Sequence, residues 1–335
     1  MKITGRAPEV PRVETSFYSF DESLRNRQGH RGYPLGTITE VYGANHTGKS
    51  TVVWSLSSII GKNTDSNIAL ADLEGFDPEF LEAVMVSQGF DGEVHSLQDE
   101  SDEKLLDNLI YKVGDKDLNF NVGILDSIGA ISPIAEAEGD LGDANMGRRA
   151  FLTNQFSRKA IKICRDNKSK CFFVVNHQHP NIGTRGYNTP GGEGKKYLSS
   201  IRMQLKRLYR KNKEETYPDG SYVIYGKIIK NRFGYKDGEF YLFVLGGSGI
   251  HRGLTALYDG IILGIVDISR TIKIGDKSFG YLKDITEQAQ LGNEEFFEPF
   301  YEAIENERNK NTRDIEDRHT NDESDSLHNN PTEED

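Results

Sequence analysis

The chain has 335 residues, a formal net charge of −11 and a hydrophobic fraction of 36%. These values are typical of a globular α/β protein with one large domain and a small appendage. No apolar run reaches the roughly 20 residues needed to cross a bilayer. No signal peptide opens the chain, so we expect a cytoplasmic protein without membrane partners. Cys164 and Cys171 are too few for a disulfide framework or a cysteine zinc cage, and we expect two reduced thiols.

The net charge hides a strong asymmetry along the chain. Residues 307–335 carry ten acidic and four basic side chains, which accounts for −6 of the total of −11. Residues 195–236 carry twelve Lys and Arg against three acidic side chains. An acidic protein with this distribution can still present a basic groove to nucleic acid.

The predicted elements begin with an extended arm, because the first 13 residues contain two prolines and little periodicity. From Thr37 onwards, apolar strands alternate with helices. The predicted strands lie at 37–43, 67–72, 120–127 and 171–176, and the predicted helices at 48–61, 77–88 and 147–167. Near-continuous apolar strands separated by helices predict a parallel sheet that is covered on both faces.

After Ile201 the pattern becomes rich in strands, at 201–208, 221–230 and 239–245, and predicts an antiparallel extension of the same sheet. The residues that follow predict a small α+β unit, and the acidic tail has the composition of a disordered segment. We therefore expect an entry segment at 1–33, an α/β core at 34–253, the small unit at 254–306 and the tail at 307–335.

The stretch GANHTGKS at 43–50 fits the pattern G-x-x-x-x-G-K-[ST] between a predicted strand and a predicted helix. Gly43 and Gly48 let the backbone curl so that its N–H groups face phosphate oxygens at a helix N-terminus. Lys49 reaches the β- and γ-phosphates, and the hydroxyl of Ser50 serves Mg²⁺. The loop predicts binding of ATP and Mg²⁺ by Gly43, Ala44, Asn45, His46, Thr47, Gly48, Lys49, Ser50 and Thr51.

Two other strand ends complete this site. Asp126 ends an apolar strand, where a carboxylate can hold the water shell of Mg²⁺. Glu74 follows the strand at 67–72, where it can orient and deprotonate the attacking water. Each acid alone would be a solvated turn residue more often than a catalytic one. Three converging strand ends favour a nucleotide hydrolase.

Three further stretches resemble the RecA-type DNA strand-exchange recombinases. SIGAISPIAEAEGDLGDANMG at 127–147 is similar to the first DNA-binding loop of the family, and NHQHPNIGTRGYNTPGGEGKKY at 176–197 to the second. KIIKNRFG at 227–234 resembles the lysine-bearing strand that reaches the nucleotide of the next subunit. The resemblance runs from Thr15 to Gly253 and implies a RecA-like P-loop ATPase core, with DNA-binding loops at about 138–147 and 178–195.

The resemblance implies a role for individual positions. Glu74 stands at the catalytic glutamate, and Asp77 and Phe80 at the residues that meet the edge and the face of adenine. Lys230 and Arg232 stand at the pair that acts in trans across the subunit interface. The positions that it assigns to DNA are the apolar wedges Met146 and Ile182, and the backbone contacts Arg158, Gly191 and Gly192.

Three departures separate the chain from the bacterial pattern. The long N-terminal helix is missing, His177 stands where the pattern has glutamine, and Arg232 where it has lysine. The exchange at Arg232 keeps the charge but replaces a point donor by a planar fork. The first two features are similar to phage-encoded recombinases of the UvsX kind.

The composition of the two loops suits DNA held without reading its sequence, which needs phosphate contacts and apolar wedges. The first loop places Met146 beside Arg148 and Arg149, and the second contains Ile182 and Arg185. Arg148 and Arg149 begin a helix, where the dipole disfavours cations, so they favour an anionic partner. The same resemblance suggests that the acidic tail competes with DNA for this groove.

Two histidines open the second loop. A metal site needs further ligands, and the loop adds only Glu193 as a carboxylate. His179 precedes a proline and is predicted to be solvated or near DNA. His177 follows Asn176 at the end of a buried strand, and we expect it to sense the γ-phosphate and to position the DNA loop.

The predicted function is an ATP-dependent recombinase that forms helical filaments on single-stranded DNA and pairs it with homologous duplex. Its expected partners are both DNA forms, other copies of the chain, and single-strand-binding and loader proteins. A hexameric helicase on the same core is the first alternative. Such a helicase would usually need an additional N-terminal domain, and only about 33 residues precede the core here. A mediator that binds ATP without exchanging strands is the second.

Overall fold

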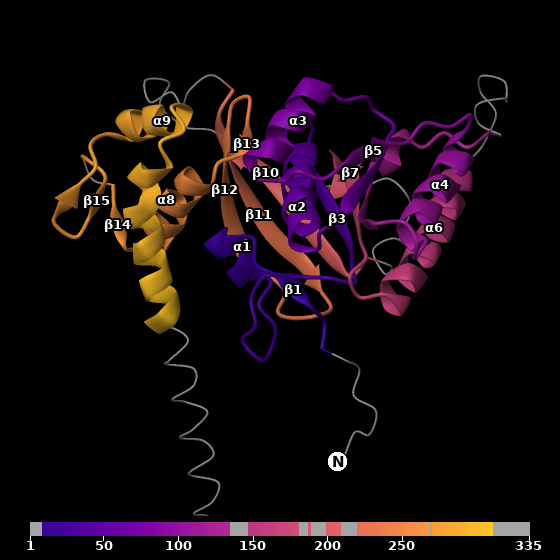
Figure 1. The fold of residues 1–335 in the computed structure, drawn as a ribbon, viewed down its shortest axis with the longest axis horizontal. Helices are drawn as coiled ribbons and strands as arrows, with labels where there is room; N and C mark the ends of the chain where they lie inside the picture. Colours follow the sequence, from indigo (N-terminus) through magenta and orange to yellow (C-terminus); the bar gives the residue numbers. More distant parts are fainter. Residues whose placement is uncertain are drawn as a thin grey trace, which may run out of the picture. The chain divides into compact units, whose positions relative to one another are not determined.

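The central sheet determines where the functional residues lie. The computed structural model describes residues 9–134, 147–180, 187–188, 199–208, 220–268 and 270–310. Within them, nine strands form one sheet in the order β13-β12-β11-β10-β3-β7-β6-β4-β5 (Figure 1). These strands are β3 Ile38–Gly43, β4 Asn67–Asp72, β5 Val94–Ser96, β6 Phe120–Asp126, β7 Cys171–His177, β10 Ile201–Leu208, β11 Tyr222–Asn231, β12 Glu239–Leu245 and β13 Gly249–Ile250.

The sheet is mainly parallel, as predicted. The strands from β10 through β3, β7, β6 and β4 to β5 pair in parallel, whereas β10, β11, β12 and β13 pair antiparallel. The predicted core strands are all present, with ends within one residue of the prediction. Their boundaries were predictable because buried parallel strands are short apolar runs between polar turns.

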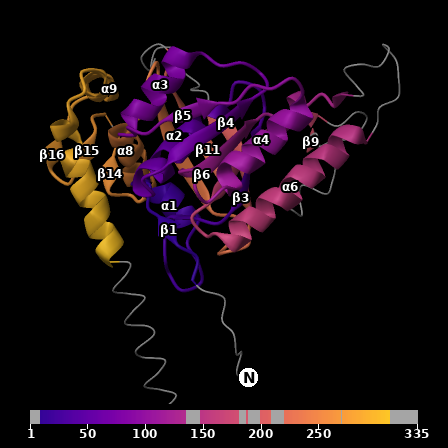
Figure 2. The ribbon, with the colours of Figure 1, turned by 45° about the vertical axis from the view of Figure 1, so that its right-hand side comes forward.

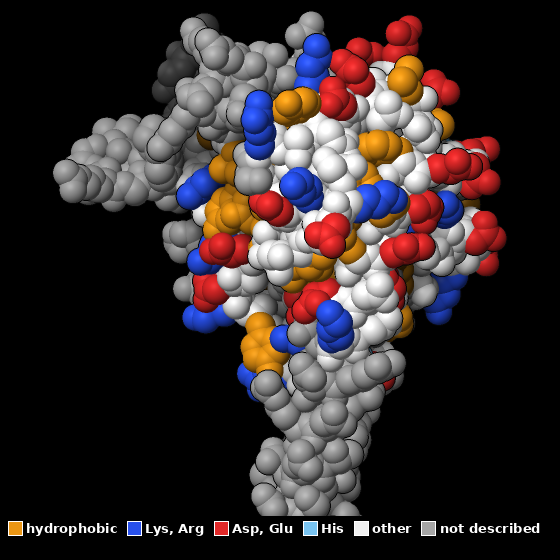
Figure 3. Space-filling model, turned by 90° about the vertical axis from the view of Figure 1, so that its left-hand side faces the viewer, with side chains coloured by type: hydrophobic (Ala, Val, Ile, Leu, Met, Phe, Trp, Pro, Cys, Tyr) orange, Lys and Arg blue, Asp and Glu red, His pale blue; other side chains and the backbone are white. Residues whose placement is uncertain are grey.

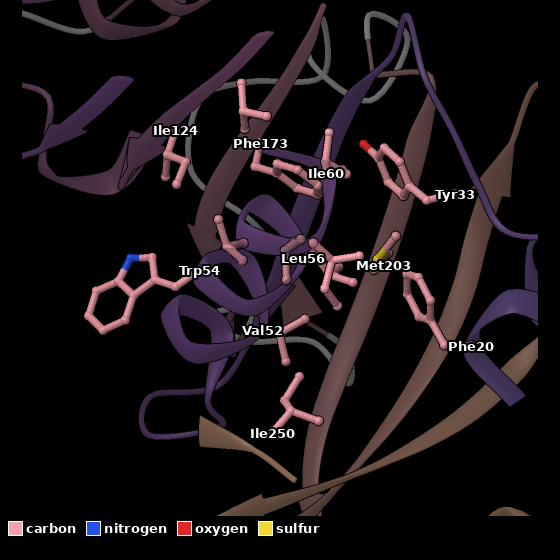
Figure 4. Packing of buried hydrophobic residues seen from close by; sticks show 14 of the residues in the cluster. Phe20, Tyr33, Val52, Trp54, Leu56, Ile60, Ile124, Phe173, Met203 and Ile250 are labelled. Carbon is pink, nitrogen blue, oxygen red and sulfur yellow. The ribbon is translucent and has the colours of Figure 1, made fainter. Parts of the chain in front are cut away.

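Helices cover both faces of the sheet. They are α2 Lys49–Asn63 and α3 Pro78–Ser87 on one face, and α4 Asp102–Gly114 and α6 Arg148–Asp166 on the other (Figures 1 and 2). Successive side chains of a strand point to opposite faces. Phe173 (Figure 4) and Val175 therefore pack on the face of α2, while Phe172 and Val174 pack on the face of α4 and α6. Two apolar cores, one on each face, hold the strand ends in place.

Helix α4 was not predicted from the sequence, although its N-terminus carries a clear local signal. Ser101 is the N-cap, and its side chain accepts a hydrogen bond from the backbone N–H of Lys104. Asp102 and Glu103 occupy the first turn, where negative charge is favourable. The apolar face of the helix is buried through Leu105, Leu109 and Val113, among others.

The guanidinium group of Arg12 is one of the groups that attach the entry segment to the sheet. Strand β1 Arg12–Val13 pairs with β2 Tyr33–Pro34, and the short helix α1 Tyr18–Ser23 lies between them in sequence. Arg12 donates to the carbonyl oxygens of Leu24 at 2.9 Å, Gly32 at 2.8 Å and Phe233 at 3.1 Å. Arg12 thereby links the entry segment to the connection between β11 and β12.

Asp21 of α1 is a buried carboxyl group with local partners. Its oxygens accept hydrogen bonds from the backbone N–H and the hydroxyl of Thr15. Burial raises the pKa of Asp21 to about 7, although the bonds from Thr15 oppose the shift. Because the pKa is higher in the folded chain, folding favours the protonated form, and this stabilisation is lost as the pH rises through about 7.

As the pH rises from 6 to 8, we expect the ionisation of Asp21 to lower the free energy of unfolding by about 1.4 kcal/mol. The side chain in Asp21→Asn is neutral at both pH values and keeps an acceptor for Thr15. This part of the change in unfolding free energy with pH should therefore disappear. Denaturant unfolding at the two pH values measures it, with the exposed Asp117→Asn as control. Equal slopes in parent and Asp21→Asn would contradict the assignment.

The chain divides into two compact units, with the boundary after Thr255, inside helix α8 Arg252–Ile262. The second unit contains a three-stranded antiparallel sheet of β14 Val266–Asp267, β15 Lys273–Ile274 and β16 Lys277–Ser278, helix α9 Leu282–Gln290 and a helix over 298–310. Its core includes the buried Phe300, and the half-buried Phe279 packs against it with ring centroids 4.7 Å apart. Figure 3 shows acidic, basic and hydrophobic side chains interspersed over the described surface in that view.

No helix among the described residues combines the length and apolarity needed to span a membrane. Both cysteines are buried free thiols, Cys164 on α6 and Cys171 at the start of β7.

Candidate nucleotide-binding site

The loop between β3 and α2 is shaped to receive phosphate. Gly48 is the N-cap of α2 with a φ of 82°, and a Cβ there would lie 2.6 Å from the hydroxyl of Tyr222. Thr47 Oγ1 and Lys49 Nζ donate to the carbonyl oxygen of Ala44, at 2.9 Å and 3.0 Å. Since Gly48 supplies no side-chain cap, the first N–H groups of α2 are available to an anion.

A buried carboxylate lies next to this loop, at the end of β6. Ser50 Oγ donates to Asp126 Oδ2 at 2.6 Å. Burial raises the pKa of Asp126 to about 6, and the nearby carboxylates of Glu74 and Asp72 add to the shift. Burial also lowers the pKa of Lys49, against the attraction of Asp126 and Glu74. A buried carboxylate with two further carboxylates nearby favours the binding of a cation.

Glu74 is held by two neighbouring side chains. Ser127 Oγ donates to Glu74 Oε1, and His177 Nε2 lies 2.7 Å from the same oxygen. The other ring nitrogen, Nδ1, lies 2.9 Å from Asn45 Oδ1. Partial burial alone would raise the pKa of Glu74, but the hydrogen bonds from Ser127 and His177 lower it overall. The carboxylate is therefore ionised at neutral pH, as a general base requires.

These groups line one cavity of about 460 Å³, a volume within the range of small-ligand sites. Two of its lining residues, Arg207 and Tyr222, were not predicted from the sequence. The Arg207 guanidinium lies 4.0 Å from the centroid of the Tyr222 ring. They come from β10 and β11, and no local motif marks them. The cavity is lined by Asn45, His46, Gly48, Lys49, Ser50, Thr51, Glu74, Asp126, His177, Arg207 and Tyr222.

The residues present fit Mg²⁺ bound together with phosphate. Among the residues that the structure describes, no group of three or more His, Cys, Asp or Glu side chains could hold a metal by itself. Ser50 and Asp126 would therefore share the ion with water and phosphate oxygens, as hard oxygen ligands do for Mg²⁺. His177 is engaged with Glu74 and Asn45.

Other predicted site residues lie outside this cavity lining. Asp77 is the N-cap of α3, where Oδ1 accepts from the N–H of Glu79 at 3.0 Å. The ring of Phe80 packs edge-on to Trp54, with centroids 5.9 Å apart. Lys230 lies near the end of β11. Arg232 is exposed just beyond that strand.

The predicted DNA-binding residues are only partly within the described chain. Arg148 and Arg149 begin α6, and Arg149 Nη1 donates to the carbonyl oxygen of Gly129 at 3.1 Å. Arg158 is exposed on the same helix. The predictions for Met146, Ile182, Arg185, Gly191 and Gly192 lie outside the described residues, as do Glu193 and the tail beyond residue 310.

A phosphate-binding loop between a buried parallel strand and a helix, with acidic residues on adjacent strand ends, defines a P-loop nucleotide-binding protein. The RecA N-terminal domain family matches residues 4–250. The chain belongs to the RecA family of recombinases.

Several bacterial RecA proteins are similar over most of this chain. The protein of Solidesulfovibrio magneticus is 29% identical over 269 residues, which cover 78% of this chain and 71% of that protein. The protein of a Nitratiruptor species is 28% identical over 306 residues, 84% of this chain and 82% of the relative. Chlorobaculum parvum RecA is 31% identical over 255 residues, 72% and 67% respectively. The crystal structure of the RadB recombinase matches 66% of this chain and 92% of its own, with 20% identity and a TM-score of 0.49.

Proposed function

We propose that this protein is a DNA-dependent ATPase that assembles as a helical filament on single-stranded DNA and exchanges strands with homologous duplex. Family membership supports a recombination function and an ATPase. The observation that carries the finer proposal is the position of His177. Its ring contacts Glu74 and Asn45 in the nucleotide cavity, and its backbone leads directly into the predicted second DNA loop.

In this proposal the chain's own residues prepare ATP for hydrolysis. Lys49 and the N–H groups at the start of α2 bind the phosphates. Ser50 and Asp126 would hold Mg²⁺ through water, and the ion would neutralise charge that develops on the phosphate oxygens. Glu74, oriented by Ser127 and His177, accepts a proton from the attacking water. Asp77 and Phe80 would contact adenine.

DNA and a second copy of the chain complete the proposal. Met146 and Ile182 are the apolar wedges, and the phosphate contacts are Arg148, Arg149, Arg158, Arg185, Gly191 and Gly192. Lys230 and Arg232 act on the nucleotide of the neighbouring subunit. The protein works in the cytoplasm on nucleoid DNA, with single-strand-binding and loader proteins as further partners.

Electron microscopy of the full chain with ATP and single-stranded DNA tests the assembly. We expect continuous helical filaments that do not form without nucleotide, because Lys230 and Arg232 would contact the ATP bound by the adjacent copy. Closed rings would instead favour a hexameric helicase. ATP binding without any assembly would favour a non-catalytic mediator.

A further inference from the structure

A row of polar side chains crosses four adjacent strands on the face of the sheet that α4 and α6 cover. Arg202 of β10 is the Cα partner of Lys230 on β11 and of Glu40 on β3. Arg202 Nε donates to Glu40 Oε2 at 2.6 Å. Asn176 of β7 donates from Nδ2 to Glu40 Oε1 at 2.8 Å. Glu40 is thus the common partner of a residue on each neighbouring strand.

These groups are buried within a sheet that is otherwise largely apolar. Glu40 is 2% exposed, Asn176 is fully buried and Arg202 is 9% exposed. A buried ion pair contributes little net stability, because desolvation of both charges offsets their attraction. Hydrophobic side chains of similar volume often stabilise a fold at least as much as a buried ion pair does. The polar row is therefore better explained by the geometry that it imposes than by the stability that it adds.

One side of the row leads to His177. The carboxylate of Glu40 can only accept hydrogen bonds, so Nδ2 of Asn176 must face it. Oδ1 of Asn176 is then left to accept the backbone N–H of His177, at 2.9 Å. With this peptide unit held, the ring of His177 reaches both Glu74 and Asn45. Glu40 is thereby linked through Asn176 to a histidine that it does not contact.

The other side of the row leads to Lys230. The guanidinium of Arg202 is held between Glu40 and the ring of Tyr42, whose centroid lies 4.7 Å away. Burial lowers the pKa of Lys230 to about 8, and the charges of Arg232 and Arg202 add to this, whereas Glu40 raises it. The carboxylate of Glu40 therefore acts on both sides of the row: it raises the pKa of Lys230 and accepts a hydrogen bond from Asn176.

We propose that Glu40 is a positioning residue that couples the end of β11, through Arg202, to the contact between His177 and Glu74, through Asn176. The inference rests on the proposed function, since His177 and Lys230 have roles in ATP turnover only there. A neighbouring copy that displaces the end of β11 would thereby alter the orientation of His177.

Glu40→Gln in the full chain provides the test, because it keeps the shape of the side chain and removes its charge. We expect its affinity for a fluorescent ATP analogue to stay within about twofold, while kcat for ATP in the presence of single-stranded DNA falls at least about tenfold, since a misplacement of about 1 Å can cost 10²-fold. Thr39→Val is the matched control. Thr39 is fully buried on the opposite face of β3, and its hydroxyl lies 2.7 Å from Tyr33 Oη. We expect Thr39→Val to keep kcat within about twofold even if stability falls.

A double-mutant cycle with His177→Ala separates positioning from general damage. If Glu40 acts through His177, then Glu40→Gln should lower kcat little further once the ring is absent. A full tenfold loss in that background, or a parental kcat in Glu40→Gln alone, would overturn the inference. Absence of ATPase activity in the parent chain would overturn the proposed function instead.

A second measurement does not depend on activity. The pKa of Lys230 can be obtained from the pH dependence of its acetylation rate, followed by mass spectrometry. Removing the negative charge of Glu40 should lower this pKa below that of the parent, because Arg202 and Arg232 then act unopposed. Asn176→Ala keeps the ion pair of Glu40 and Arg202, so it should leave the pKa of Lys230 unchanged. It should still lower kcat, because it removes the link to His177. If Glu40→Gln folds and the pKa of its Lys230 equals that of the parent, the coupling to β11 is refuted. If Glu40→Gln does not fold, a parental kcat in Asn176→Ala would refute the coupling to His177.

Discussion

Glu74→Gln is expected to bind ATP with parental affinity and to hydrolyse it about 10²- to 10⁴-fold more slowly, the usual contribution of a general base. The amide can still accept hydrogen bonds from Ser127 and His177, so the cavity should keep its shape. It cannot take a proton from water at neutral pH. Filaments of this variant should persist longer on DNA, because hydrolysis no longer releases them.

Lys49→Ala is the comparison variant for this experiment. It removes the cation that we propose binds the phosphates, so ATP binding and filament activation should both be lost. Steady-state ATPase assays, nucleotide binding and filament lifetimes by microscopy distinguish the two variants. Hydrolysis at the parental rate in Glu74→Gln would show that Glu74 is not the base.

His177→Ala is expected to retain ATP binding and some basal turnover while losing most of the stimulation by single-stranded DNA. The imidazole joins Glu74 and Asn45 at the position where β7 runs into the predicted DNA loop. Without the ring, DNA bound by the loop has no contact through which to improve the position of Glu74. By linkage, ATP should also favour DNA binding less strongly in this variant.

ATPase rates with and without single-stranded DNA measure this effect. His95→Ala is a matched control, because His95 also contacts a glutamate, Glu93 at 2.8 Å, but lies on β5 at the edge of the sheet. Full DNA stimulation in His177→Ala would refute the switch. Zinc assayed in the purified proteins tests the alternative, since stoichiometric zinc that disappears on mutation would indicate a metal site.

The sequence by itself determined the parts of this protein that depend on local pattern. The apolar runs predicted the core strands to within one residue, and the spacing in GANHTGKS located the phosphate loop between a strand and a helix. These predictions succeed because strand formation and the turn at Gly48 depend on neighbours in sequence. The capped start of α4 at Ser101 was a local signal of the same kind that the prediction missed.

Only the tertiary structure decided which distant residues meet. In parallel sheets, order along the chain does not fix order in space, and here β3 lies between β10 and β7. That order brings Glu40 between Arg202 and Asn176, and places Arg207 beside Tyr222 at the cavity. No spacing along the chain encodes these contacts, because each depends on strand order and register. The phosphate loop is therefore readable from sequence, whereas the polar row that holds its neighbours follows from how the strands are arranged.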